Sequence, residues 1–213
     1  MKLSGALFDL DGTLLDTVPL FLAAYRFAFF EFTGRSFSDG EILSLSGPSE
    51  EGIIQKVVPD NWKRCLDLYV QYELSHLESV KAFSGLSIVL ELLNKRNVKM
   101  AVITGRKNNA HKFLDHTGLT PYFDEVETGS THGSSKQTSI EHIIGKWNYP
   151  PQQLIYVGDT AYEMAEAQKT GVLPIRAKWS SYLIDNGSQT NIGLEFNSVA
   201  DFSRWVNEIA LQE

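Results

Sequence analysis

The chain has 213 residues, of which 43% are hydrophobic, so it is long enough for one large domain or for a domain that carries an insert. The formal net charge is −7 and the 19 lysines and arginines are scattered, which argues against a nucleic-acid partner. The single cysteine, Cys65, excludes an intrachain disulfide, and Arg26 interrupts the most apolar stretch before it reaches membrane-spanning length. We expect a cytoplasmic protein without a membrane partner, and the oligomeric state stays open.

Short apolar runs alternate with helical patterns along the chain, which is typical of β-α-β units and a parallel sheet. The predicted strands cover residues 5–10, 98–104, 124–128, 154–159 and 173–177. The predicted helices between and after them cover residues 85–96, 107–117, 136–147, 160–170 and 198–211. The sequence therefore predicts an α/β fold with a doubly wound, mainly parallel sheet, that is, a Rossmann-like core.

The interval between the first two predicted strands is far longer than a crossover connection needs. Its pattern is helical, and the predicted helices cover residues 17–33, 39–46, 49–57 and 60–79. The simplest account is an inserted helical domain over residues 17–81. Residues 1–16 and 82–213 would then form the core.

Polar residues follow the predicted strands at the points where those strands end. Asp9 and Asp11 end the first strand, Thr104 ends the second, and Asp159 ends the fourth, while Lys136 follows the third after a loop rich in glycine and serine. The carboxyl ends of parallel strands meet at one edge of a sheet, and ligands bind there. We expect these side chains to converge on one site.

The residue types at this edge suit a magnesium ion and a phosphate group. Asp9, Asp11 and Asp159 offer the hard oxygen ligands that Mg²⁺ prefers, and the ion would neutralise two aspartates that lie one residue apart. Lys136 would add a fixed positive charge, while the Thr104 hydroxyl and nearby backbone N–H groups would hold phosphate oxygens.

Four stretches resemble the motifs of the haloacid dehalogenase superfamily, in the family's order. They are DLDGTLLD at residues 9–16, VITGR at residues 102–106, the downstream Lys136, and YVGDTAYEM at residues 156–164. The insert is similar to the helical cap of the subfamily that contains phosphoglycolate phosphatase. The resemblance covers essentially the whole chain.

The resemblance implies a role for each matching residue. Asp9 would be the nucleophile and Asp11 the general acid and base. The phosphate would be bound by Lys136 and by Thr104 with the adjacent Gly105. Asp159 would bind the metal with Asp9 and Asp11.

Other positions depart from the family's pattern. Glu163 stands where aspartate is more usual, so it would reach the metal through water or hold Lys136. Arg106 is expected to have a surface or structural role, with substrate binding as the alternative. Substrate selection would lie in the cap loop near Gly47, Pro48 and Ser49, which contains no basic residue.

The sequence thus predicts a Mg²⁺-dependent phosphatase that hydrolyses a small phosphorylated metabolite through an aspartyl-phosphate intermediate. Asp9, with an ordinary pKa of about 4, would be ionised at neutral pH. Two alternatives stay open: a phosphomutase of the same superfamily, and a non-enzymatic signalling module that merely accepts a phosphoryl group. The sequence does not identify the leaving group.

Overall fold

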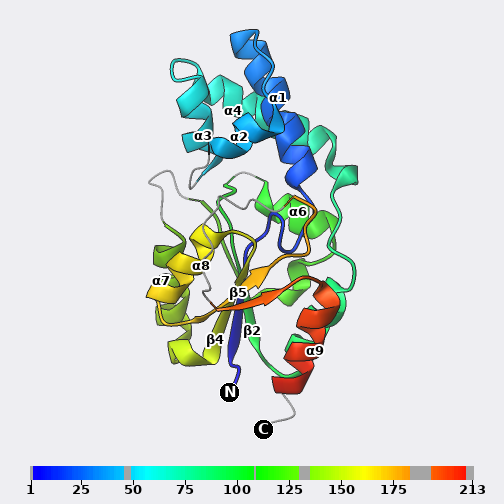
Figure 1. Ribbon diagram of the computed structural model, residues 1–213, viewed down its shortest axis with the longest axis vertical. Helices are drawn as coiled ribbons and strands as arrows, with labels where there is room; N and C mark the ends of the chain where they lie inside the picture. Colours follow the sequence, from blue (N-terminus) through cyan, green and yellow to red (C-terminus); the bar gives the residue numbers. More distant parts are fainter. Residues whose placement is uncertain (1, 46–48, 108, 130–134, 183–192, 210–213) are drawn as a thin grey trace.

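The computed structural model describes residues 2–45, 49–107, 109–129, 135–182 and 193–209. A helical part lies at one end of the molecule, and an α/β part with both chain termini lies at the other (Figure 1). Among the described residues, no helix combines the length and apolar character that crossing a bilayer requires.

The α/β part contains a parallel sheet whose strands are ordered β3-β2-β1-β4-β5-β6. The strands are β1 (Gly5–Phe8), β2 (Lys99–Ile103), β3 (Glu125–Glu127), β4 (Leu154–Gly158), β5 (Leu173–Ala177) and β6 (Leu194–Phe196). The predicted doubly wound parallel sheet is confirmed. Strand β6 was not predicted, because it has only three residues and its side chains are partly or fully exposed.

Helices cover both faces of this sheet, which explains why its central strands read as continuous apolar runs. Along β1, Ala6 and Phe8 join one buried cluster, whereas Leu7 joins the other. The first face is covered by α5 (Leu86–Lys95), α6 (Ala110–His116) and α9 (Val199–Ile209), and the second by α7 (Lys136–Trp147) and α8 (Ala161–Lys169). Short 3₁₀ turns lie at Leu77–Ser79, Thr120–Tyr122 and Pro151–Gln153.

The insert between β1 and β2 folds around a hydrophobic cluster of its own. Its helices are α1 (Val18–Thr33), α2 (Asp39–Ser44), α3 (Glu50–Val57) and α4 (Trp62–Ser75). Helices α1 and α4 pack together, and the rings of Tyr25 and Tyr69 lie 4.4 Å apart between their centroids. The predicted helices ending at residues 46 and 211 extend beyond the described residues.

The chain enters and leaves the insert side by side. The backbone N–H of Asp16 donates to the carbonyl of Lys81 at 2.9 Å, and that of Phe83 donates to Leu14 at 3.1 Å. The carboxyl edge of the sheet faces the insert, so the inserted helices stand over the strand ends (Figure 1).

Packing of the insert can be tested at two neighbouring residues of α1. Phe29 is fully buried, whereas Phe30 is 50% exposed. Phe29→Ala should lower the free energy of unfolding by about 3–5 kcal/mol, because it leaves a cavity in the cluster. The control Phe30→Ala should lower it by much less. Urea denaturation of both variants measures the difference, and equal losses would contradict this packing.

Candidate active site

The site lies where the strand order of the sheet reverses, between β1 and β4. Asp9 follows β1 and Asp159 follows β4, and the backbone N–H of Asp9 donates to the carbonyl of Val157 at 2.8 Å. Gly12 has a φ of +76°, and a Cβ there would lie 2.5 Å from Oδ2 of Asp159. Only glycine allows the loop after β1 to pass so close to Asp159.

Lys136 joins the first and last of the predicted motifs. Its Nζ contacts the Asp9 carboxylate, donates to the carbonyl of Ile103 at 2.6 Å and lies 2.8 Å from Oε1 of Glu163. Burial lowers the pKa of Lys136, but Asp9 and Glu163 outweigh that effect and raise it well above its ordinary value. The lysine is therefore a fixed positive charge beside Asp9.

Three buried carboxylates, from Asp9, Asp159 and Glu163, place ligand oxygens within 4.8 Å of one another. Burial raises the pKa of Asp9 to about 8, and the nearby Glu163 adds to that rise. Burial, together with the nearby Glu163 and Asp9, raises the pKa of Asp159 well above its ordinary value. The expectation that Asp9 is ionised at neutral pH therefore requires a further cation, and this all-oxygen set suits Mg²⁺.

Glu163 holds Lys136, one of the two roles expected for it. Its Oε1 also accepts from the Tyr156 hydroxyl at 3.0 Å. Its Oε2 accepts from the backbone N–H and hydroxyl of Thr160 at 3.2 and 3.0 Å, which closes a capping box at the start of α8. Burial raises the pKa of Glu163, but Lys136 and these donors outweigh burial and lower it.

Thr104 is buried at the end of β2, and its hydroxyl oxygen accepts from the backbone N–H of Arg106 at 3.1 Å. Gly105 lies between them and borders the cavity described below. Of the predicted phosphate-binding residues, Lys136 contacts Asp9 directly, whereas Thr104 and Gly105 follow β2, the strand that pairs with β1.

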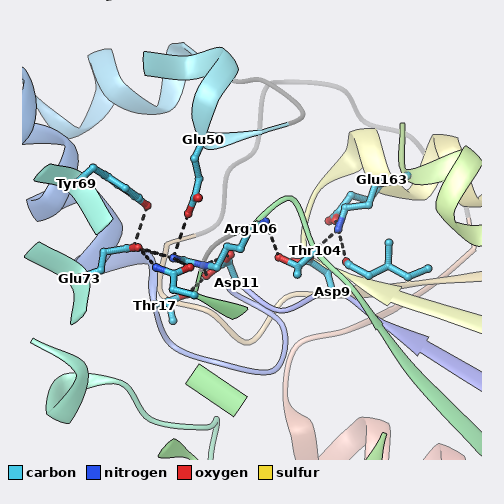
Figure 2. Close-up of polar contacts among 12 residues, drawn as sticks. Asp9, Asp11, Thr17, Glu50, Tyr69, Glu73, Thr104, Arg106 and Glu163 are labelled. Carbon is cyan, nitrogen blue, oxygen red and sulfur yellow. Dashed lines mark hydrogen bonds and ion pairs between the residues drawn. The ribbon is translucent and has the colours of Figure 1, made fainter. Parts of the chain in front are cut away.

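Arg106 is buried, with 2% of its surface exposed, so the surface role considered for it is wrong and the structural one is supported. Its Nε lies 2.8 Å from both carboxylate oxygens of Asp11, and its Nη1 lies 2.7 and 2.8 Å from those of Glu73. Nη1 also lies 3.3 Å from Glu50 (Figure 2). One guanidinium therefore joins the core to α3 and α4 of the insert.

The Asp11 carboxylate faces Arg106 and the Thr17 hydroxyl. Within the described part of the chain, the carboxylate cluster that could hold a metal comprises Asp9, Asp159 and Glu163, without Asp11. The structure thus brings two of the three predicted ligands together and adds Glu163 to them.

Sequence reasoning missed Glu73, which is fully buried. It accepts from Arg106, from Asn109 and from the Tyr69 hydroxyl at 2.9 Å. A signal was present, because Glu73 follows Tyr69 by four residues and Leu66 by seven, in the apolar stripe of the predicted helix. A charged residue in such a stripe needs a buried partner.

A cavity of about 150 Å³ opens between the insert and the core, next to Arg106. The core contributes Asp11, Gly105 and Arg106. The insert contributes Phe21, Tyr25, Ser49, Glu50, Ile53 and Tyr69.

Ser49 borders this cavity, as expected for a substrate-selecting residue, but its side chain also caps α3. Its hydroxyl oxygen accepts from the backbone N–H of Gly52 at 3.2 Å. Gly47 and Pro48, the other residues predicted for selection, lie outside the described residues.

The fold and the site together define an α/β enzyme with a buried cluster of carboxylates that could hold a metal cation. The model of the family described as haloacid dehalogenase-like hydrolase matches residues 6–177. The chain belongs to this family, and the resemblance seen in its motifs is confirmed.

Similar proteins include pyrophosphatase PpaX of Oceanobacillus iheyensis, 28% identical over 84% of this chain and 86% of the relative. Phosphoglycolate phosphatase of Synechococcus elongatus is 24% identical over 81% of this chain and 82% of the relative. The crystal structure of a predicted phosphoglycolate phosphatase from Haemophilus somnus has a TM-score of 0.83 at 19% identity, covering 96% of this chain and 98% of that one. The last of these shows the shared fold.

The buried Glu50 makes the stability of the protein depend on pH. Burial raises its pKa from an ordinary 4.5 to about 8, Arg106 opposes the rise, and Glu73 and Asp11 add to it. A carboxyl whose pKa is raised by folding stabilises the protein below pH 4.5, and this stabilisation is lost as the pH rises through about 8.

Glu50→Gln removes this titration while it keeps the shape of the side chain. Between pH 5 and 8, the free energy of unfolding of the wild type should therefore fall relative to that of Glu50→Gln. Urea denaturation at several pH values measures both proteins. Parallel pH profiles would show that Glu50 does not titrate in this interval.

Proposed function

We propose that the protein is a Mg²⁺-dependent phosphatase that hydrolyses a small phosphate monoester through an aspartyl phosphate on Asp9. The observation that carries the proposal is the buried contact of Asp9 with Lys136, beside Asp159 and Glu163, at the switch point of the sheet. Membership of a hydrolase family and relatives named as phosphatases support it.

In the first step, a carboxylate oxygen of Asp9 attacks phosphorus, and the bond from phosphorus to the leaving alcohol breaks. Lys136, Thr104 and the backbone N–H groups near Gly105 would hold the phosphoryl oxygens. A bound Mg²⁺, held by Asp9, Asp159 and Glu163, would neutralise the clustered carboxylates and the charge on the phosphoryl group.

Asp11 would act as the general acid and base. Its protonated form gives a proton to the leaving oxygen, and its ionised form then takes one from the water that cleaves the aspartyl phosphate. Arg106 can hold one oxygen of this carboxyl group while the other carries the proton. We propose this role for Asp11 in place of metal binding, because its carboxylate faces Arg106.

We also propose that residues 17–81 form the cap domain, and residues 1–16 with 82–213 the catalytic core. The cap's own hydrophobic cluster and its paired connections support these boundaries. A cap over the strand ends would exclude bulk water from Asp9 during phosphoryl transfer.

Asp9→Asn should lower the turnover of p-nitrophenyl phosphate in Mg²⁺ by about 10³-fold or more, since it removes the nucleophile. The exposed Asp16, in the same loop, provides the control Asp16→Asn, which should keep activity near that of the wild type. Steady-state assays measure both. A single burst without further turnover in the wild type would favour the signalling-module alternative.

Dialysis against EDTA should abolish hydrolysis, and added Mg²⁺ should restore it. Asp159→Asn should raise the Mg²⁺ concentration that gives half-maximal rate, because one carboxylate ligand is lost. Titration of activity with Mg²⁺ measures this shift. Full activity in EDTA would contradict the metal role of Asp9, Asp159 and Glu163.

A further inference from the structure

The cavity between cap and core lies on the side of the site where the leaving group departs. Of the residues with proposed catalytic or phosphate-binding roles, Asp11 and Gly105 border the cavity, whereas Asp9, Thr104 and Lys136 do not. If the proposed function holds, the leaving oxygen lies beside Asp11 while phosphorus lies beside Asp9. The rest of the alcohol then extends into the cavity, and the cavity wall selects the substrate.

Within the described part of the chain, the wall of this cavity offers no free positive charge. Among the residues that border the cavity, Arg106 is the only base, and it contacts the carboxylates of Asp11, Glu73 and Glu50. The positive charge of Arg106 is thus already engaged by carboxyl groups of the protein. A second anion on the substrate would therefore find no free cation among these described wall residues to pair with.

Glu50 is the acceptor that the cap presents to the cavity. It begins α3 and is 8% exposed, and its 3.3 Å contact with Nη1 is longer than the contacts that Arg106 makes with Asp11 and Glu73. Phe21, Tyr25 and Tyr69 add aromatic surface to the same wall. Such a wall accepts hydrogen bonds from the substrate and covers its carbon chain.

We propose that the substrate is the phosphate monoester of an amino alcohol or a polyol, an alcohol that carries no second anion and donates hydrogen bonds to Glu50. Phosphoglycolate and pyrophosphate, named in the two relatives, each carry a second anionic group. The cavity of this chain thus distinguishes its substrate class from theirs.

Three two-carbon esters of similar size test the proposal directly. They are 2-aminoethyl phosphate, 2-hydroxyethyl phosphate and phosphoglycolate, whose distal groups are a cation, a neutral hydroxyl and an anion. With the Mg²⁺-loaded wild type, kcat/KM for each of the first two should exceed that for phosphoglycolate by about tenfold or more. A higher kcat/KM for 2-aminoethyl phosphate would indicate an amino alcohol, and a higher value for 2-hydroxyethyl phosphate a polyol.

Two variants on adjacent residues assign the effect to Glu50. Above about pH 8, where the Glu50 carboxyl is ionised, Glu50→Gln removes one negative charge from the cavity wall and should reduce the preference of 2-aminoethyl phosphate over phosphoglycolate several-fold. Glu51→Gln removes the same charge from a residue that pairs with Lys107 and does not border the cavity. This control should leave the ratio of the two rates near that of the wild type.

The possible outcomes separate the two proposals. Equal rates for all three esters, or faster hydrolysis of phosphoglycolate, would overturn the leaving-group proposal while the phosphatase stands. An unchanged ratio in Glu50→Gln would overturn the role of Glu50. No turnover of these esters or of p-nitrophenyl phosphate would overturn the phosphatase itself. The wild-type panel decides the substrate class even if Glu50→Gln does not fold.

Discussion

Two groups of acidic side chains lie at the site, and each contacts one basic side chain. Lys136 contacts Asp9 and Glu163, and Arg106 contacts Asp11, Glu50 and Glu73. An isolated buried carboxylate is costly, so the contacts with Lys136 and Arg106 are what allow these carboxylates to be buried. The two groups differ in position: the first lies within the core, and the second joins the core to the cap (Figure 2).

The two groups of contacts thus give the core and the cap different roles. Asp9 and Asp159 follow strands of the sheet, and Lys136 and Glu163 lie in the first turns of helices that cover it. The fold of the core alone therefore positions these residues. The cavity beside Arg106 needs α1, α3 and α4 as well. We infer that the core holds what all phosphate esters share, and that the cap recognises what distinguishes them.

The sequence indicated that Asp9, Lys136 and Asp159 would lie together, because motifs at the ends of apolar strands must meet at one edge of a parallel sheet. Five of the six strands described in the sheet, and the main helices, were predicted because each leaves a local pattern of apolar residues in the sequence. Strand β6 was missed because two of its three side chains are exposed, whereas those of β3, an edge strand of the same length, are half-buried. The Arg106 contacts were missed because they depend on how the cap docks, which no local pattern encodes. Glu73 shows the intermediate case: its position in an apolar stripe indicates burial, but not its partner.

The paired connections of the cap also bear on how the chain folds. Strands β1 and β2 pair although Gly5 and Lys99 are roughly ninety residues apart. If the cap folds first, its two ends already lie together, through Asp16 and Lys81. The loop that remains to be closed is then between a quarter and a third as long. Each halving of a loop lowers the entropic cost of closure by about 0.6 kcal/mol, so early folding of the cap would favour central strand pairing by about 1 kcal/mol. The insert that separates β1 from β2 in sequence would thus help to bring them together in space.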